Sequence, residues 1–385
     1  MRSSDRDRVY LAPVDHLRAV AAVLVVVYHG CQLLGARIEG HAFTPVADWL
    51  YSPNPAATLV FEGHTAVALF MVLSGFIFTV GAYGRPIRYG RFITNRLLRV
   101  YPLYLVIAVL GLATHVTLPG YEDLVRILTF TTPSRPYGGV FWTLGVELQF
   151  YLLFPLLHRL LGDRGPAALL RLLAAVALLR ALVWFSGPAP APHTEALYLG
   201  LAGRIDQFLL GMLAAWCYLH HRDLLRARWL TPTALALAVT VLWSFNQVHG
   251  FVSDSPLKLL WSTVEGAVWA LVVAAYVAGA RTAGGALSRA LARLGEVSFS
   301  VYLIHFMVLT VLCRYAGLAD LLPSLPPVWA AFTLTLLVAL PLTVALSFLT
   351  YHAIELPFLR LRRTYLGTPA AETPRPRLRE SSRGR

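Results

Sequence analysis

The sequence predicts an all-α integral membrane protein, a bundle of about ten transmembrane helices with both termini in the cytoplasm. Three observations predict this fold. Of the 385 residues, 57% are hydrophobic and only 14% are charged, whereas a soluble domain has about 25% charged residues. The apolar residues fall into runs of roughly 20, the length of helix that crosses a bilayer. Arginines gather in alternate loops between these runs, which is typical of the cytoplasmic side of a membrane protein.

The apolar runs predict ten spans. They lie near residues 17–34, 60–82, 101–118, 141–160, 167–185, 203–219, 230–246, 258–280, 297–315 and 327–350. The pattern is least regular at 101–118 and at the break between 141–160 and 167–185. The first run lacks a small-residue cleavage site, so we expect it to remain as a helix rather than to be removed as a signal peptide.

Loop charge orients the bundle. Alternate loops carry arginine clusters within residues 85–99, 159–164, 222–228 and 281–293, and the intervening loops carry few basic residues. The clustered loops are expected in the cytoplasm, because basic residues are retained on that side. An even number of spans then places both termini there.

The predicted domain organisation is simple. A cytoplasmic N-terminus over residues 1–16 precedes a membrane domain over 17–358, and a tail follows over 359–385. The tail is rich in Arg, Pro, Ser and Glu, and we expect it to be disordered because it has too few apolar groups to pack. The net charge of +13 is divided among short clusters, so it favours membrane loops over a nucleic-acid-binding face.

Metal and nucleotide motifs are missing from the sequence. Cys31, Cys217 and Cys313 are far apart and lie in or beside apolar runs, so we expect small buried side chains and no metal site. No HExxH, GxSxG, Walker A or GxGxxG pattern lies in a usable context, which leaves zinc hydrolysis, serine-elbow and nucleotide-fold chemistry without support.

The first span carries three ionisable residues, Asp15, Arg18 and His29, in PVDHLRAVAAVLVVVYHG. Helical geometry places Arg18 and His29 about 20° apart on the helix wheel and about 16 Å apart along the axis. Arginine suits phosphate, and histidine suits removal of a proton from a hydroxyl. The pair therefore predicts a donor whose anionic part is held inside while its reactive end points outward. The alternatives are an arginine that reaches the headgroups and a histidine bonded to a neighbouring helix.

Two further sets of charged residues lie at predicted spans. Arg96 and Arg99 in RFITNRLLRVYP share a helical face and could grip a phosphate together, although cytoplasmic arginines would also occur here by topology alone. Glu147 in FWTLGVELQFY lies about two turns into its span. A carboxylate at this depth needs a cation, a water-filled cavity or a proton, so we interpret it as functional.

The remaining polar residues within spans are interpreted as mainly structural. His305 in SFSVYLIHF is expected to bond across helices, with catalysis as the alternative. Arg204 is expected to pair with Asp206, two positions along the same helix. Glu355 is expected to be an exposed cap at the end of the last span. Glu265 and His64 receive no role.

These motifs together resemble the acyltransferase-3 family of integral membrane O-acyltransferases, over roughly residues 10–361. The first-span segment is similar to the family's Asp–x–x–Arg followed by His. ALFMVLSGFIFT, with Ser74 and Gly75, resembles its second-span signature. RFITNRLLRVYP resembles its basic segment, and FWTLGVELQFYLLFPLL the segment that carries its acidic residue. GRIDQFLLGM, SFSVYLIHF and IELPFLRL resemble three later segments.

The resemblance implies transfer of an acetyl or other short acyl group from cytoplasmic acyl-CoA to a hydroxyl in a bacterial inner membrane. The implied acceptor carries carbohydrate: a surface polysaccharide, a glycolipid or a glycosylated metabolite such as a macrolide. Acyl-CoA is a co-substrate, and no cofactor is expected to stay bound.

The resemblance also assigns roles to residues. Arg18, Arg96 and Arg99 would hold the coenzyme A phosphates. His29 would act as general base, with Glu147 orienting it or binding the acceptor. Asp15, His305 and Ser74 are expected to bind substrate or orient other groups.

Three departures from the family pattern put acceptor choice in doubt more than the reaction. His16 replaces a glycine, Leu148 a second acid, and Ala68 a residue that is often polar. A transporter or flippase for a glycolipid or small molecule remains the alternative, since it too would have many spans and buried charges. The sequence shows no internal repeat, which disfavours that class, and the intact Arg18 and His29 disfavour an inactive sensor.

Overall fold

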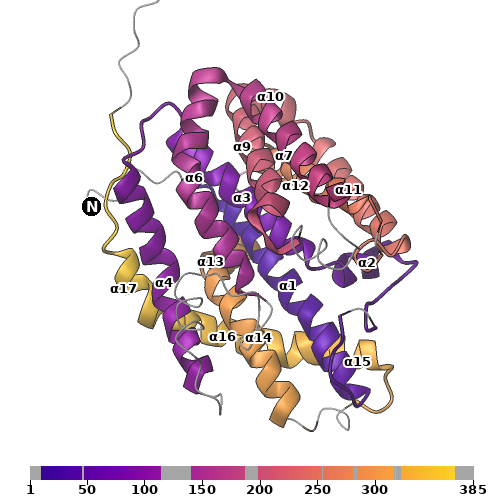
Figure 1. The fold of residues 1–385 in the computed structure, drawn as a ribbon. Coiled ribbons are helices and arrows are strands. Elements are labelled where there is room, and N and C mark those ends of the chain that lie inside the picture. Colours follow the sequence, from indigo (N-terminus) through magenta and orange to yellow (C-terminus); the bar gives the residue numbers. More distant parts are fainter. Residues whose placement is uncertain are drawn as a thin grey trace, which may run out of the picture.

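The structure is a computed structural model that describes residues 10–45, 47–113, 140–186, 198–253, 255–280, 285–315, 317 and 322–368. Within these ranges the regular elements are helices (Figure 1). In order they are α1 (Ala12–Ile38), α2 (Pro55–Phe61), α3 (Thr65–Ala82), α4 (Tyr89–Ala113), α6 (Trp142–Arg164), α7 (Pro166–Ser186), α9 (Leu201–His220), α10 (Arg222–Leu225), α11 (Leu230–Gln247), α12 (Lys258–Gly279), α13 (Ala286–Glu296), α14 (Ser298–Tyr315), α15 (Pro327–Leu334), η3 (Thr335–Ala339), α16 (Leu340–Thr350), η4 (Tyr351–Glu355) and α17 (Leu356–Leu359).

The all-helical prediction is confirmed over the described ranges, and a helix lies at each predicted span. Seven of the described helices are long and apolar enough to cross a membrane, or eight if α13 and α14, bent by 70°, form one span. Helices α9 and α11 occupy predicted spans but are not among the seven. The count of ten and the cytoplasmic placement of the termini therefore remain predictions. The segments 1–9, 114–118 and 369–385, on which some predictions rest, lie outside the described residues.

Local sequence explains two boundaries that the hydrophobic pattern left indistinct. Gly165 ends α6 with a φ of +69°, a conformation that glycine adopts without strain. Pro166 then begins α7, a position where its missing N–H costs no hydrogen bond. The predicted span over 60–82 instead contains a break, because α2 ends at Phe61 and α3 begins at Thr65.

Helix α1 crosses the middle of the bundle and contacts α3, α12, α13, α14 and α15 (Figure 1). Beside it, α3 and α9 approach closely at two glycines. A Cβ on Gly75 would lie 2.2 Å from the Phe208 carbonyl oxygen, and one on Gly211 would lie 2.1 Å from the Val72 oxygen. Small residues allow such backbone contact between membrane helices, which explains the glycine in the second-span motif.

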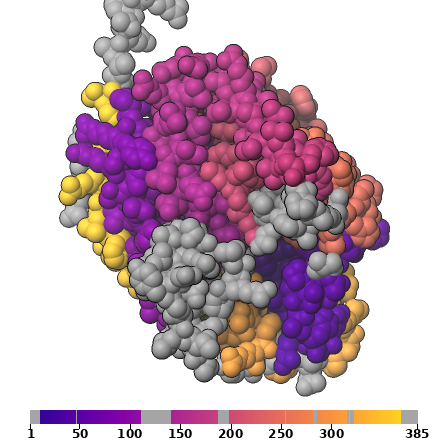
Figure 2. All heavy atoms as spheres, viewed as in Figure 1, coloured from indigo at the N-terminus to yellow at the C-terminus, as the bar shows by residue number. Residues whose placement is uncertain are grey.

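The surface of α6 and α7 is apolar where it faces outward. Figure 2 shows these helices forming the upper part of one face of the molecule. Their exposed side chains include Leu156 at 65%, Leu178 at 62% and Phe185 at 75%. A water-soluble protein rarely exposes so much apolar surface in one place, so this face is suited to contact with lipid.

The last predicted span contains two π-helical stretches, η3 and η4. A π-helical turn holds more residues than an α-helical turn and often occurs at functional sites. Here η4 directs Tyr351 and Glu355 into the protein, where both are buried.

Residues 361–368, here called the C-terminal strap, pack against the loop between α3 and α4 beside the start of α4 (Figure 1). Ile87 and Leu366 form a β-bridge, the Arg88 N–H donates to the Tyr365 carbonyl (2.8 Å), and the Gly367 N–H donates to the Pro86 carbonyl (2.8 Å). The strap is therefore ordered, held by this backbone pairing and by burial of Leu366, which is 3% exposed. The predicted disorder of the rest of the tail falls on residues outside the described ranges.

Candidate functional site

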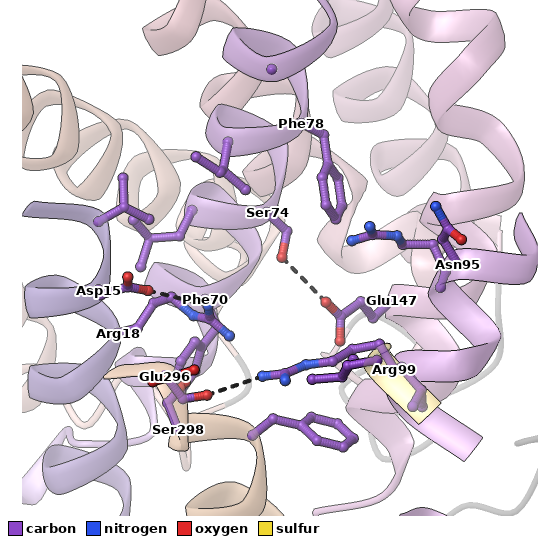
Figure 3. Close-up of a pocket in the computed structure, with 18 of the residues that line it drawn as sticks. Asp15, Arg18, Phe70, Ser74, Phe78, Asn95, Arg99, Glu147, Glu296 and Ser298 are labelled. Atoms are coloured by element: carbon purple, nitrogen blue, oxygen red, sulfur yellow. Dashed lines mark hydrogen bonds and ion pairs between the residues drawn. The ribbon is translucent and has the colours of Figure 1, made fainter. Parts of the chain in front are cut away.

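A cavity of about 660 Å³ opens between α1, α3, α4, α6, α13, α14, η4 and the strap. Its wall holds seven arginines and three carboxylates: Arg18, Arg96, Arg99, Arg289, Arg293, Arg362, Arg363, Asp15, Glu147 and Glu296. Ser74 also lines it. Six predicted site residues are therefore brought together from four helices, namely Asp15, Arg18, Ser74, Arg96, Arg99 and Glu147. Figure 3 labels all of these except Arg96. His29 and His305 do not line this cavity.

Asp15 and Arg18 lie near the N-terminal end of α1. Arg18 Nη1 lies 3.4 Å from Asp15 Oδ1, and the two side chains are 31% and 17% exposed. Both side chains line the cavity, and partly exposed ion pairs are weak, so an anion in the cavity can replace Asp15 as the partner of Arg18. Gly295 at the end of α13 contacts the Asp15 backbone, since a Cβ there would lie 2.0 Å from the Asp15 oxygen.

Arg99 is held from two sides. Its Nη1 lies 3.2 Å from Glu355 Oε2, and its Nη2 donates to the Glu296 carbonyl at 3.3 Å (Figure 3). Glu355 is fully buried and also accepts from Ser300. The prediction of an exposed cap at Glu355 is wrong, because the π-helical turn of η4 rotates this residue inward to a cationic partner.

Arg96 is oriented by aromatic rings. Its guanidinium lies 4.8 Å from the ring centroid of Phe78, 5.4 Å from that of Phe92 and 6.0 Å from that of Tyr151. Its Nε is buried and finds no hydrogen-bond partner among the described residues. Cation–π contacts orient the charge without neutralising it. Among the described residues no carboxylate forms an ion pair with Arg96, so it presents its positive charge to the cavity.

Glu147 accepts hydrogen bonds from Ser74 Oγ (3.2 Å) and from the Tyr151 hydroxyl, both at Oε1. It faces the same space as Arg99 (Figure 3). In the described part of the chain it makes no contact with His29, so orientation of His29 by Glu147 has no support from the geometry. Tyr151 was not predicted, although its position one turn after Glu147 was a usable signal.

His29 and His305 bond to each other across α1 and α14. His29 Nδ1 lies 3.1 Å from His305 Nε2 and 3.1 Å from the Val25 carbonyl oxygen. His305 Nδ1 lies 2.7 Å from the Tyr302 carbonyl oxygen, to which only a protonated nitrogen can donate. We therefore assign the proton of His305 to Nδ1 and that of His29 to Nδ1 as well, since His305 Nε2 is then an acceptor. His29 Nε2 is left with an open lone pair.

Tyr302 separates the cavity from the histidine pair. It lines the cavity, and His305 follows one turn later on α14. Its hydroxyl accepts from Thr143 Oγ1 (2.8 Å) and donates to the Val140 carbonyl (3.0 Å). Its ring lies 6.1 Å from that of Phe70, which also lines the cavity. Tyr302 is therefore a cavity-lining residue beside the histidine pair, with its ring centroid 5.8 Å from that of His305.

The other buried charges form structural pairs between α7, α9 and α12. Arg180 binds Asp206 through two contacts of 2.9 Å, and Arg204 Nη1 lies 3.3 Å from Glu265 Oε2. The predicted pair of Arg204 with Asp206 is wrong, because residues two apart on a helix project about 200° apart. The ion pair with Arg204 explains how the carboxylate of Glu265 can be buried. Within the described segments no three His, Cys, Asp or Glu side chains gather as a metal site requires.

Comparison with known proteins identifies the fold around this cavity. The acyltransferase domain model of the acyltransferase-3 family (Acyl_transf_3) matches residues 12–352. The chain belongs to this family. Helices α1 to α16 lie within the matched region, which ends inside η4, so the strap side of the cavity wall lies beyond it.

Three relatives are similar to this chain, and two of them are named as an acyltransferase and a putative acetyltransferase. The acyltransferase MdmB of Streptomyces mycarofaciens is 30% identical over 290 residues, covering 66% of this chain and 70% of that protein. Nodulation protein 10 of Rhizobium leguminosarum bv. viciae is 27% identical over 372 residues, 88% of this chain and 93% of that protein. The putative acetyltransferase ORF330 of Acidianus two-tailed virus is 24% identical over 287 residues, 71% of this chain and 82% of that protein. No solved structure matches.

Proposed function

We propose that this membrane acyltransferase moves an acetyl or other short acyl group from cytoplasmic acyl-CoA to a hydroxyl of a carbohydrate-containing acceptor. The acceptor is a surface polysaccharide, a glycolipid or a glycosylated metabolite such as a macrolide, and the membrane is the inner membrane of a bacterium. The observation that carries the proposal is the cavity that gathers Arg18, Arg96 and Arg99 and that extends to Tyr302, one helical turn before His305 of the His29–His305 pair.

The donor half of the proposal rests on charge and size. The seven arginines of the cavity wall outnumber its three carboxylates, and guanidinium groups bind phosphate oxygens through two hydrogen bonds. A volume of about 660 Å³ lies within the usual range of ligand pockets, about 300–1,000 Å³. The cavity opens where α1 begins, on the side that loop charge assigns to the cytoplasm. Acyl-CoA is made there and carries both phosphates and a thioester.

The chemical step uses His29 as general base. His29 Nε2 takes the proton of the acceptor hydroxyl while its oxygen attacks the thioester carbonyl. The tetrahedral intermediate then breaks its C–S bond, and the thiolate takes the proton from His29, which yields the ester and free coenzyme A. His305 Nε2 accepts from His29 Nδ1–H throughout and stabilises the transient imidazolium. General-base help of this kind contributes about 10²–10⁴-fold.

In this scheme Glu147 shapes the site that binds the donor and does not orient the general base His29. It fixes Ser74 and Tyr151 in the cavity wall and offsets part of the arginine charge there. The reactive end of the donor must pass Tyr302 to reach His29, because Tyr302 lines the cavity and its ring lies 5.8 Å from that of His305.

The test measures thioester consumption by purified protein reconstituted in lipid vesicles. Acetyl-CoA is the donor, and glycosides, oligosaccharides and macrolides are the acceptors. We expect free thiol only when an acceptor is present, and an acceptor heavier by one acetyl group. Movement of an acceptor across the vesicle membrane without thiol release would refute the proposal and identify the transporter considered as the alternative.

A further inference from the structure

The cavity has a second group of arginines at its mouth. They come from α13 and the C-terminal strap, whereas Arg18, Arg96 and Arg99 come from α1 and α4. Arg293 and Arg363 are exposed, while the side chains of Arg18 and Arg99 are only 31% and 14% exposed. The cavity thus has an inner and an outer ring of positive charge at different depths.

Helix α13 holds its part of the outer ring in a fixed place. Arg289 and Arg293 are four residues apart, so they project from one face of the helix. The helix is bent by 70° from α14, and Gly295 anchors its end against the Asp15 backbone. The α13 arginines therefore stand beside the end of α1 that carries Arg18.

The strap is held by a side chain that itself lines the cavity. Asn95 is 4% exposed, and its amide pairs with the Arg363 backbone in both directions: Asn95 Nδ2 donates to the Arg363 carbonyl (2.7 Å), and the Arg363 N–H donates to Asn95 Oδ1 (3.1 Å). Arg85 Nε donates to the Gly367 carbonyl (3.1 Å) further along the strap. Asn95, which holds the strap, is adjacent to Arg96 of the inner ring on α4. The same turn of α4 therefore carries Arg96 and positions Arg363 of the outer ring.

Acyl-CoA carries anionic groups at two distances from its thioester. The diphosphate lies between pantetheine and adenosine, and the 3′-phosphate lies on the ribose, further from the sulfur. A phosphate monoester carries about −1.5 to −2 charges at neutral pH and favours arginine partners. Two rings of arginine at two depths match this arrangement.

We propose that α13 and the strap form a subsite for the 3′-phosphate of the donor, with Arg293 and Arg363 as its ligands and Asn95 as the residue that positions the strap. This inference rests on the proposed acyl-CoA donor. The subsite selects acyl-CoA over thioesters of pantetheine or 3′-dephospho-CoA, and the inner ring of Arg18, Arg96 and Arg99 serves the diphosphate that coenzyme A and 3′-dephospho-CoA share.

The experiment compares kcat/KM for acetyl-CoA and acetyl-3′-dephospho-CoA in the reconstituted protein. We expect the wild type to prefer acetyl-CoA by about tenfold to a hundredfold, the value of charge-assisted hydrogen bonds to one phosphate. The double variant Arg293→Gln, Arg363→Gln should bring this ratio close to one while kcat/KM for the dephospho donor stays unchanged. Asn95→Ala should lower the ratio in the same way, and Arg96→Gln should weaken both donors equally.

Arg360→Gln is the matched control, because Arg360 is an exposed arginine just before the strap and outside the cavity wall. It should leave the ratio at the wild-type value. Inhibition gives a second measurement that needs no variant: adenosine 3′,5′-bisphosphate should inhibit the wild type more strongly than 5′-AMP. A double variant with the wild-type ratio, or equal inhibition by the two nucleotides, would overturn the subsite. A wild type that consumes neither thioester would overturn the proposed function as well.

Discussion

His29 and His305 meet at 3.1 Å between Nδ1 of the first and Nε2 of the second, with the Tyr302 carbonyl fixing the proton of His305 on its other nitrogen. The chain of donors runs from His29 to His305 and on to the α14 backbone. It leaves His29 Nε2 as the one ring nitrogen of the pair able to accept a proton from a substrate, and it connects the first-span motif to a residue 276 positions later.

Replacement of His29 by alanine should lower kcat by about 10²–10⁴-fold, because the acceptor hydroxyl loses its general base. The KM for acyl-CoA should change little, since His29 does not line the donor cavity. Initial rates of thiol release over a range of acetyl-CoA concentrations separate the two constants. His352→Ala, at an exposed histidine, is the control. A fully active His29→Ala protein would exclude His29 as the base.

His305 should act through His29 rather than on the substrate. His305→Ala removes the acceptor for His29 Nδ1–H, so we expect kcat to fall with the KM for acyl-CoA unchanged. His305→Gln provides a side-chain oxygen that can accept the same bond and should restore part of kcat. Initial rates give kcat and the KM for acyl-CoA of each variant. A His305→Gln protein with a kcat no higher than that of His305→Ala, or a raised KM in both, would contradict the role of His305 as the hydrogen-bond acceptor for His29.

Loss of Glu355 should destabilise the protein. Its fully buried carboxylate lies 3.2 Å from Arg99, and removal of one partner from a buried pair costs about 3–5 kcal/mol because the other charge is left uncompensated. Thermal unfolding in detergent should show a clearly lower midpoint for Glu355→Ala. Asp163→Ala breaks the exposed pair with Arg159 and should shift the midpoint very little. Equal shifts would contradict the importance of the buried pair.

Gly75→Ala should separate α3 from α9, since the added Cβ would meet backbone atoms at 2.2 Å. Backbone cannot move aside as a flexible side chain can, so we expect a low yield of folded protein or a lowered unfolding midpoint. Gly90→Ala is the matched helical control, because nothing lies within 4 Å of the Cβ it would add. Size-exclusion chromatography and thermal unfolding measure both, and a Gly75→Ala protein as stable as Gly90→Ala would contradict the close approach.

Stability should fall as pH rises from about 5 to about 8 because of Glu62, which precedes the spanning helix α3. Burial raises the pKa of Glu62 from 4.5 to about 7. The folded protein therefore favours the protonated carboxyl, a stabilisation complete below the unfolded pKa and lost as pH passes the folded pKa. The loss is at most about 3 kcal/mol. Unfolding midpoints across this pH range measure it.

Glu62→Gln is the control for this pH dependence. Its amide oxygen can still accept from Asn246 Nδ2 and Trp49 Nε1, the two donors to Glu62 Oε1, but it cannot titrate. The midpoint of Glu62→Gln should vary less with pH than that of the wild type. Identical pH profiles would mean that Glu62 is not the group responsible.

Relationships within one helix were predictable from the sequence. The Arg96 and Arg99 pair and the placement of Arg18 on one side of the bundle follow from helical periodicity, and the break at Gly165 and Pro166 follows from backbone chemistry. The gathering of Arg18, Arg96 and Glu147 in one cavity required the family resemblance as well, because periodicity does not say which helices are neighbours.

Relationships that depend on a change of helical register were not predictable. A π-helical turn leaves no clear pattern of apolar residues, so the inward rotation of Glu355 was missed. Partners from distant segments, such as Arg180 for Asp206, have no local signal. The order of the strap was not predicted for a different reason. Asn95 binds the backbone of Arg363, and because the backbone is the same for every residue type, the sequence gives no sign of this contact.

The strap also has a consequence for biosynthesis. Membrane helices are inserted in order as the ribosome makes them, and Arg362, Arg363, Thr364 and Tyr365 reach the cavity only after α17 is in place. Until then one wall of the cavity is missing, and Asn95 has no backbone to hold. In a nascent chain with all its earlier helices already inserted the cavity is therefore incomplete, and its wall closes only when the last membrane segment and the strap after it have been made.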